Sequence, residues 1–132
     1  MAEGRGPFRS WKSVEPHAFR PGVTLRAIGG EQVLVCSVRY EAGTRVQLHA
    51  HEATEQVMVM LEGELEMTVG TETRTLSEGD AVVVGRGIEH ELHSEAGCAF
   101  FEALAPVPLD HVPDRDRDLV LGVDGGATHV AS

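Results

Sequence analysis

The chain has 132 residues, of which 42% are hydrophobic and 24% charged, and this length and composition are typical of one globular domain. Its 21 acidic and 11 basic residues give a formal net charge of −10, which would repel nucleic-acid phosphates and an anionic membrane surface, so we expect neither as a partner. No apolar run approaches the roughly 20 residues that span a bilayer, and MAEGRGPFRSWKSVEP lacks the apolar centre of a secretory signal, so we expect a cytoplasmic protein.

Short segments rich in β-branched residues recur along the chain and are separated by glycine-containing turns. In chain order they are TLRAI, QVLVCSVRY, RVQLHAH, EQVMVMLEG, ELEMTVG, TRTL, DAVVVG, HELHS and CAFFEAL. Strands of this length and spacing are typical of a sandwich or barrel, and no segment has a long apolar stripe of helical period. We therefore predict an all-β domain over residues 24–105, with an N-terminal extension over 1–23 and a C-terminal tail over 106–132.

The tail, PVPLDHVPDRDRDLVLGVDGGATHVAS, holds three of the six prolines. It predicts an extended segment that wraps the domain or a neighbouring subunit, with one short helix or strand around RDLVLG. The alternating charges from Asp114 to Asp118 predict a solvated surface. Cys36 and Cys98 each lie in an apolar run and in no metal or redox spacing, so we expect buried structural thiols.

The stretch HAHEATEQ, residues 49–56, is the strongest chemical signal. Residues two apart in a strand point to one face, so His49 and His51 converge. If the turn EAT folds the next strand back, Gln56 comes close to both imidazoles. His90 follows the glycine-bounded strand GDAVVVGRG, and three histidines with one side-chain oxygen form a plausible set of metal ligands.

Two longer motifs resemble those of the cupin superfamily. From Gly43 to Gly63 the chain has a glycine, five residues, His-x-His, four residues, Gln56, six residues and a glycine. From Gly79 to Ser94 it resembles the second cupin motif, and MLEGELEMTVG is also typical of cupins. The resemblance, to a small single-domain bacterial cupin, implies a double-stranded β-helix, or jelly-roll barrel, whose ligand histidines point inward and hold one divalent transition metal: zinc, nickel, iron, manganese or cobalt.

The chain departs from the cupin pattern at three positions. Counting back from Gly63 places Gln56 where cupins usually have glutamate, a feature that resembles the uronate-converting cupins, although Glu55 remains an alternative oxygen ligand. Gly85 and Ser94 replace the usual proline and asparagine but affect no ligand. The other histidines are expected at the surface: His17, His93, His111 and His129.

Strand alternation also predicts residues that bind the substrate. Those sharing a face with the ligands are Gln47, Met58, Met60 and Leu92. Their character favours a flat or apolar organic substrate over a sugar phosphate, with core packing as the alternative for the two methionines. Tyr40 and Glu102 are candidates for proton transfer.

Three histidines and a glutamine contribute no charge, so the ion keeps its full +2 and should be a strong Lewis acid. This favours chemistry on a carbonyl or enol, and the short chain resembles the metal-dependent cyclases of aromatic polyketide biosynthesis. Three alternatives stay open: a uronate ring-opening cupin, an oxygen-dependent enzyme of the quercetinase type, and a non-catalytic binding cupin. Irregular ends that could cover a sheet edge predict a homodimer.

Overall fold

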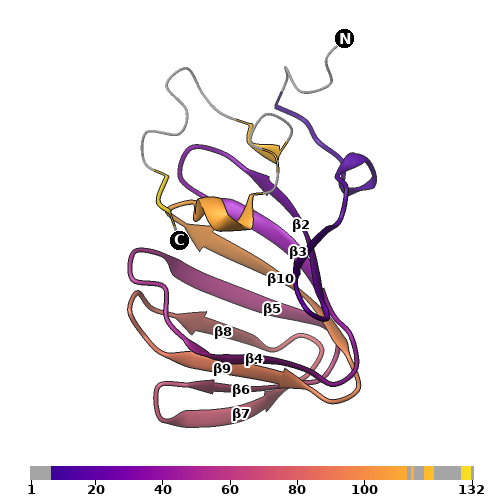
Figure 1. Ribbon diagram of the computed structural model, residues 1–132, viewed down its shortest axis with the longest axis vertical. Coiled ribbons are helices and arrows are strands. Elements are labelled where there is room, and N and C mark those ends of the chain that lie inside the picture. The colour runs from indigo at the N-terminus through magenta and orange to yellow at the C-terminus, as the bar shows by residue number, and fades with distance from the viewer. Residues whose placement is uncertain (1–6, 113, 115–117, 121–128, 132) are drawn as a thin grey trace.

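The computed structural model describes residues 7–112, 114, 118–120 and 129–131, and it forms two facing antiparallel sheets (Figure 1). The six-stranded sheet has the order β1 (His17–Arg20), β2 (Val23–Gly29), β3 (Leu34–Tyr40), β10 (Cys98–Ala105), β5 (Glu55–Gly63) and β8 (Ala81–Val84). The four-stranded sheet has the order β4 (Thr44–His49), β9 (His90–Ser94), β6 (Leu65–Val69) and β7 (Glu72–Leu76). The predicted all-β jelly roll is confirmed. Within the described residues, no helix is long and apolar enough to cross a bilayer.

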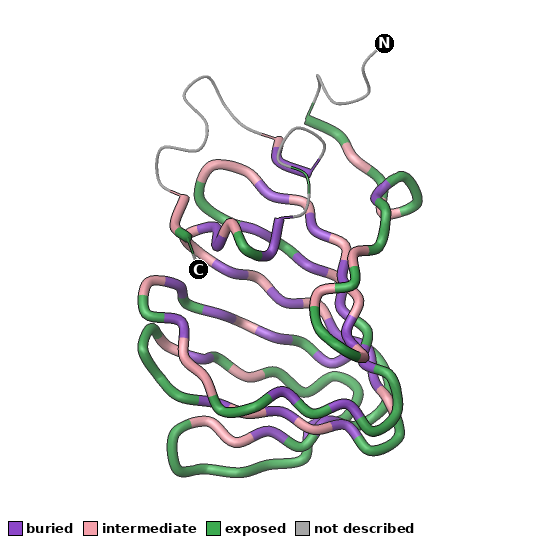
Figure 2. Tube along the Cα trace, viewed as in Figure 1, coloured by how far each residue is buried: buried purple, intermediate pink, exposed green. Residues whose placement is uncertain are grey.

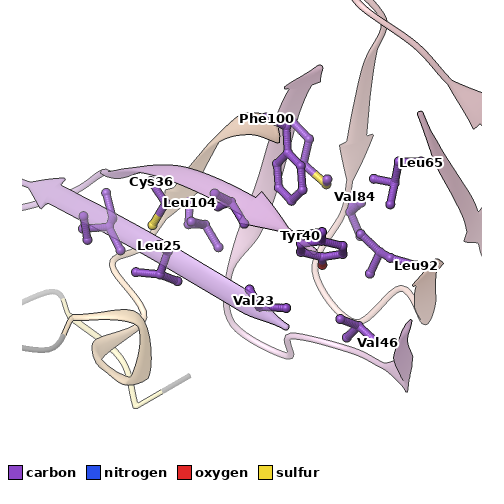
Figure 3. Packing of buried hydrophobic residues seen from close by; sticks show 14 of the residues in the cluster. Val23, Leu25, Cys36, Tyr40, Val46, Leu65, Val84, Leu92, Phe100 and Leu104 are labelled. Atoms are coloured by element: carbon purple, nitrogen blue, oxygen red, sulfur yellow. The ribbon is translucent and has the colours of Figure 1, made fainter. Parts of the chain in front are cut away.

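Alternating burial along the strands builds one core between the sheets. In β2 every second residue is buried and those between are half-buried, and Figure 2 shows this alternation along the trace. Phe100, Leu104, Leu25 and Leu65 are among the most deeply buried side chains, and Figure 3 shows them gathered around Tyr40. Cys36 and Cys98 are free, buried thiols, as predicted.

The turn between β5 and β6 requires glycine. Gly63 has a φ of +78°, and a Cβ built there would lie 2.8 Å from the Cα of Cys98 and still closer to the carbonyl oxygen of Gly97. This close approach lets the start of β10 pair with the end of β5, where Cys98 lies opposite Gly63.

A β-bulge in β4 changes which side chains face the barrel interior. Val46 pairs with Leu92 and His49 with His90, so β4 has one residue more than β9 over this interval. The extra residue leaves Gln47 exposed and Leu48 51% exposed, while Val46 is buried. The expectation that Gln47 shares the face of His49 is therefore wrong, because strict alternation fails across a bulge.

The ends of the chain pack on the barrel. β1, inside the predicted N-terminal extension, pairs with β2. In the tail, a 3₁₀ helix, η3 (Leu109–His111), is held by backbone hydrogen bonds from Leu109 to Val130 (2.8 Å) and from Asp110 to Ala131 (3.2 Å). In the stretch RDLVLG, Leu119 forms an isolated parallel bridge with Gly29, while residues 115–117 and 121–122 lie outside the described part.

Two residues of the tail are buried where a surface position was predicted, whereas Asp114 is exposed as predicted. Asp118 is 0% exposed, and its carboxylate accepts a hydrogen bond from the backbone N–H of Asp114 at 3.2 Å. His111 is 4% exposed. The alternating charges predicted a solvated stretch. The tail instead packs on the barrel and buries the side chains of Asp118 and His111.

Candidate metal centre

Three histidines converge at one end of the barrel. His49 ends β4, His51 follows it, and His90 begins β9 opposite His49. Ring nitrogens of the three lie within 4.8 Å of one another, and the ring centroids are 4.2 Å apart for His49 and His90. We refer to His49, His51 and His90 as the histidine cluster; its spacing could hold one metal ion.

Backbone carbonyls fix the tautomers of two of these rings. Nδ1 of His49 lies 2.7 Å from the carbonyl oxygen of Gln47, and Nδ1 of His90 lies 3.0 Å from that of Ile88. A carbonyl oxygen only accepts, so Nδ1 carries the proton and donates in both rings. Nε2 then presents its lone pair, which is the arrangement that metal-binding histidines adopt.

Burial keeps two rings of the cluster, His51 and His90, in their neutral form. Burial, followed by the charges of the neighbouring histidines, lowers the pKa of His51 to about 4. Burial also lowers the pKa of His90, although its hydrogen bond to Ile88 acts in the opposite direction. Neutral imidazole is the form that binds a metal.

Gln56 enters the same cavity from β5 and is held by Glu102 of β10. Gln56 Nε2 donates to Glu102 Oε1 at 2.5 Å, and the Gln56 side chain is buried while Glu55 is exposed. Because the amide nitrogen faces the carboxyl group, Oε1 is left to face elsewhere. Among the described residues, Gln56 Oε1 and His90 Nε2 are buried atoms with no hydrogen-bond partner. These two atoms suit a cation, and the donor set fits a divalent transition metal.

Glu102 lines the cavity and is hydrogen-bonded to Gln56. Burial raises the pKa of the Glu102 carboxyl group, while the charge of His111 and the hydrogen bond from Gln56 lower it by less. The structure therefore gives Glu102 a contact that orients Gln56. Its predicted part in proton transfer stays a prediction.

The cavity has a volume of about 40 Å³. Tyr40, Leu92 and Glu102 line it, whereas Gln47, Met58 and Met60 do not. Both methionines are 1% exposed and belong to the core, the alternative that the sequence left open. Such a volume holds a few water-sized ligands and lies far below the roughly 300 Å³ of a pocket for an organic ligand.

The ends of the chain supply cavity residues that the sequence did not indicate. His111 of η3 lines the cavity, with its ring centroid 5.9 Å from that of His51 and 4.5 Å from that of Phe19. Its Nδ1 is 2.8 Å from Asp110 Oδ1. Phe19 and Arg20 of β1 also line the cavity. In the sequence, His111 stands out only as a histidine beside an acid, between Pro108 and Pro113. It belongs to no motif with a fixed spacing from the barrel motifs.

Comparison with known proteins identifies relatives of the fold. The model of the cupin domain family matches residues 36–102. An RmlC-like cupin from Shewanella frigidimarina is 20% identical, with a TM-score of 0.76 over 81% of this chain and 96% of that one. KdgF from a Halomonas species is 22% identical, with a TM-score of 0.75 over 81% and 99%. The polyketide cyclase RemF from Streptomyces resistomycificus is 19% identical, with a TM-score of 0.67 over 76% and 79%. No curated protein sequence matches the chain.

Proposed function

Because the chain belongs to the cupin family, we propose that it is a metal-dependent enzyme acting on a carbonyl or enol group of a small organic substrate. The reaction class that we propose is that of a cyclase or lyase, such as ring closure of an aromatic polyketide intermediate. The proposed ligands of its one divalent ion, which is zinc, nickel, iron, manganese or cobalt, are His49, His51, Gln56 and His90.

The observation that carries this proposal is the pair of buried acceptors without partners, Gln56 Oε1 and His90 Nε2. A buried polar atom without a partner costs about 1–3 kcal/mol, so two of them in one small cavity favour a bound cation. Both atoms belong to residues that line the cavity of the histidine cluster. Without a bound cation, the two unpaired atoms would only lower the free energy of unfolding.

Several groups around the proposed ligands then have a part. A divalent ion supplies Lewis acidity, which polarises a carbonyl or enol oxygen. The carbonyls of Gln47 and Ile88 keep two imidazoles in the ligating tautomer, and Glu102 holds the amide of Gln56. Tyr40 also lines the cavity and can donate a proton or hydrogen bond there.

Two observations support the reaction class. All four proposed ligands are neutral, which leaves the ion its full charge and favours Lewis-acid chemistry over chemistry on a more oxidised iron. A solved polyketide cyclase shares the fold at a TM-score of 0.67. A uronate ring-opening reaction is the second candidate, because Gln56 stands at the position where the uronate-converting cupins are also expected to have glutamine.

Substrate entry needs movement at the cavity mouth. A volume of about 40 Å³ does not admit an aromatic polyketide. Phe19 of β1 and His111 of η3 both line this cavity with their ring centroids 4.5 Å apart, and both belong to the ends of the chain. We propose that these two segments separate when substrate binds.

The test is metal analysis of the native protein and of two variants, all purified without added metal. We expect about one transition metal per chain in the native protein and in Glu55→Ala, whose side chain is exposed on the opposite face of β5, and much less in Gln56→Ala. A native protein that stays empty when offered each metal in turn would show that the binding-module alternative is right. An iron protein that consumes dioxygen would contradict the Lewis-acid proposal.

A further inference from the structure

Two polar side chains of the cavity that are not among the proposed metal ligands, Arg20 and Tyr40, lie in one row across three strands. Arg20 of β1 pairs with Val23 of β2, which pairs in turn with Tyr40 of β3. Residues directly opposite in neighbouring strands point to the same face, and two strand spacings put the backbones of Arg20 and Tyr40 roughly 10 Å apart. Both side chains line the cavity.

Tyr40 presents a hydrogen-bond donor at the cavity. The residue is 6% exposed, and its ring packs edge-on against Phe100 at a centroid distance of 5.3 Å. No residue that the structure describes makes a hydrogen bond to its hydroxyl group. Burial, followed by the charge of Glu102, raises the pKa of Tyr40, so the phenol keeps its proton and donates.

Arg20 reaches the mouth of the cavity because of a bulge. β1 has one residue more than β2 between Ala18 and Arg20, so that Phe19 and Arg20, although adjacent, both line the cavity. The guanidinium carbon lies 4.8 Å from the centroid of the Phe19 ring. Besides histidines, Arg20 is the one basic residue among the described residues that line the cavity.

Asp110 is the nearest competitor for this charge. Its carboxylate is bonded to His111 at 2.8 Å, and no ion pair within 4.0 Å joins it to Arg20 in the described part of the chain. Arg20 is therefore an exposed cation that lines the cavity and belongs to no ion pair in the described part of the chain. In a chain of net charge −10, the overall field repels anions, so any anion that enters must be held by local contacts.

We propose that Arg20 and Tyr40 form a carboxylate-binding subsite, and that the substrate is an oxo acid whose carbonyl oxygen faces the histidine cluster. The carbonyl half of this statement rests on the proposed function. A guanidinium and a phenol are matched donors for the two oxygens of a carboxylate. The intervening wall is apolar, with Val23, Leu92 and Phe100 lining it, which suits the carbon chain between the two groups.

The experiment compares acids with their neutral esters. Isothermal calorimetry would measure the binding of 2-, 3- and 4-oxopentanoate and of the corresponding methyl esters to the protein loaded with its metal. We expect one acid to bind at least about tenfold more tightly than its ester, since hydrogen bonds to charged groups are among the strong ones. In Arg20→Gln the ratio of the affinity for the acid to that for its ester should fall below about threefold. Tyr40→Phe should weaken binding of the acid by about threefold. The matched control is Arg45→Gln, an exposed arginine of β4 outside the cavity, which should keep the native ratio.

Equal affinities for acid and ester in the native protein would overturn the subsite, and so would an equal loss in Arg20→Gln and Arg45→Gln, because the effect would then be one of overall charge. An unchanged affinity for the acid in Tyr40→Phe would show that Tyr40 is not part of the carboxylate-binding subsite. The same titrations on metal-free protein separate the two proposals. If no metal binds but the ratio still depends on Arg20, the proposed function fails and the subsite stands.

Discussion

One face of strand β5 runs from the cavity into the core, and its residues meet two different environments. Gln56 lines the cavity with an unpartnered oxygen, whereas Met58 and Met60, two and four residues further along the same face, are 1% exposed among apolar side chains. Alternation assigns all three to the barrel interior. The alternation of side chains along a strand therefore predicts which face of the sheet a residue is on. It does not predict how far along the barrel the residue lies.

Of the changes that test the contrast between cavity and core, we expect the largest effect on metal affinity at His90. In His90→Ala, metal affinity should fall more than about a hundredfold, because loss of a ligand exceeds the 10–100-fold typical of an outer contact. His93→Ala is the control, since His93 lies on the same strand on the other face. Competition with a chromophoric metal indicator would measure the metal affinity of both variants. Equal metal binding in the two variants would show that His90 is no ligand.

In the core, Met60→Ala should affect stability and leave metal binding alone. Deleting a buried methionine side chain costs about 2–5 kcal/mol of unfolding free energy, measured by denaturant titration of the metal-free protein. Val59→Ala, at a neighbouring position that is 40% exposed, should cost clearly less. A large loss of metal affinity in Met60→Ala would contradict the assignment of Met60 to the core.

At the boundary between the two regions, Glu102 should act through Gln56. Glu102→Leu leaves the amide nitrogen of Gln56 without its acceptor, and metal affinity should fall about 10–100-fold. Glu102→Gln keeps an acceptor oxygen at this position and should recover most of that loss. Calorimetry with the metal that the native protein carries would compare them. Identical losses in the two variants would show that the hydrogen bond does not position Gln56.

The last prediction concerns the reactivity of the two thiols and leaves the metal centre untouched. Burial raises the pKa of Cys36 well above its usual value, followed by the charges of Glu102 and Asp118, and burial also raises that of Cys98. Since the thiolate is the reactive form, a disulfide reagent at pH 8 should react with the folded protein over ~100-fold more slowly than with the unfolded one. Rapid reaction of one thiol in the folded state would place it in an open segment.

The strands and the histidine cluster could be predicted because both depend on local spacing. Glycine-bounded runs fix the strands, and His-x-His puts two imidazoles on one side. The place of Gln47 could not be predicted, because a bulge follows from the pairing of two strands rather than from either alone. The cavity positions of Arg20 and His111 depend on where the chain ends fold back, which no period encodes.

The central place of β10 in the six-stranded sheet sets the order of events during synthesis. β10 pairs on one side with β3 and on the other with β5, and Figure 1 shows it between them. On the ribosome, β3 and β5 are made long before their shared neighbour appears, so both have an unpaired edge at this stage. Glu102 reaches Gln56 only when β10 has emerged. Gln56 is therefore held in place only after all three histidines of the cluster have been made.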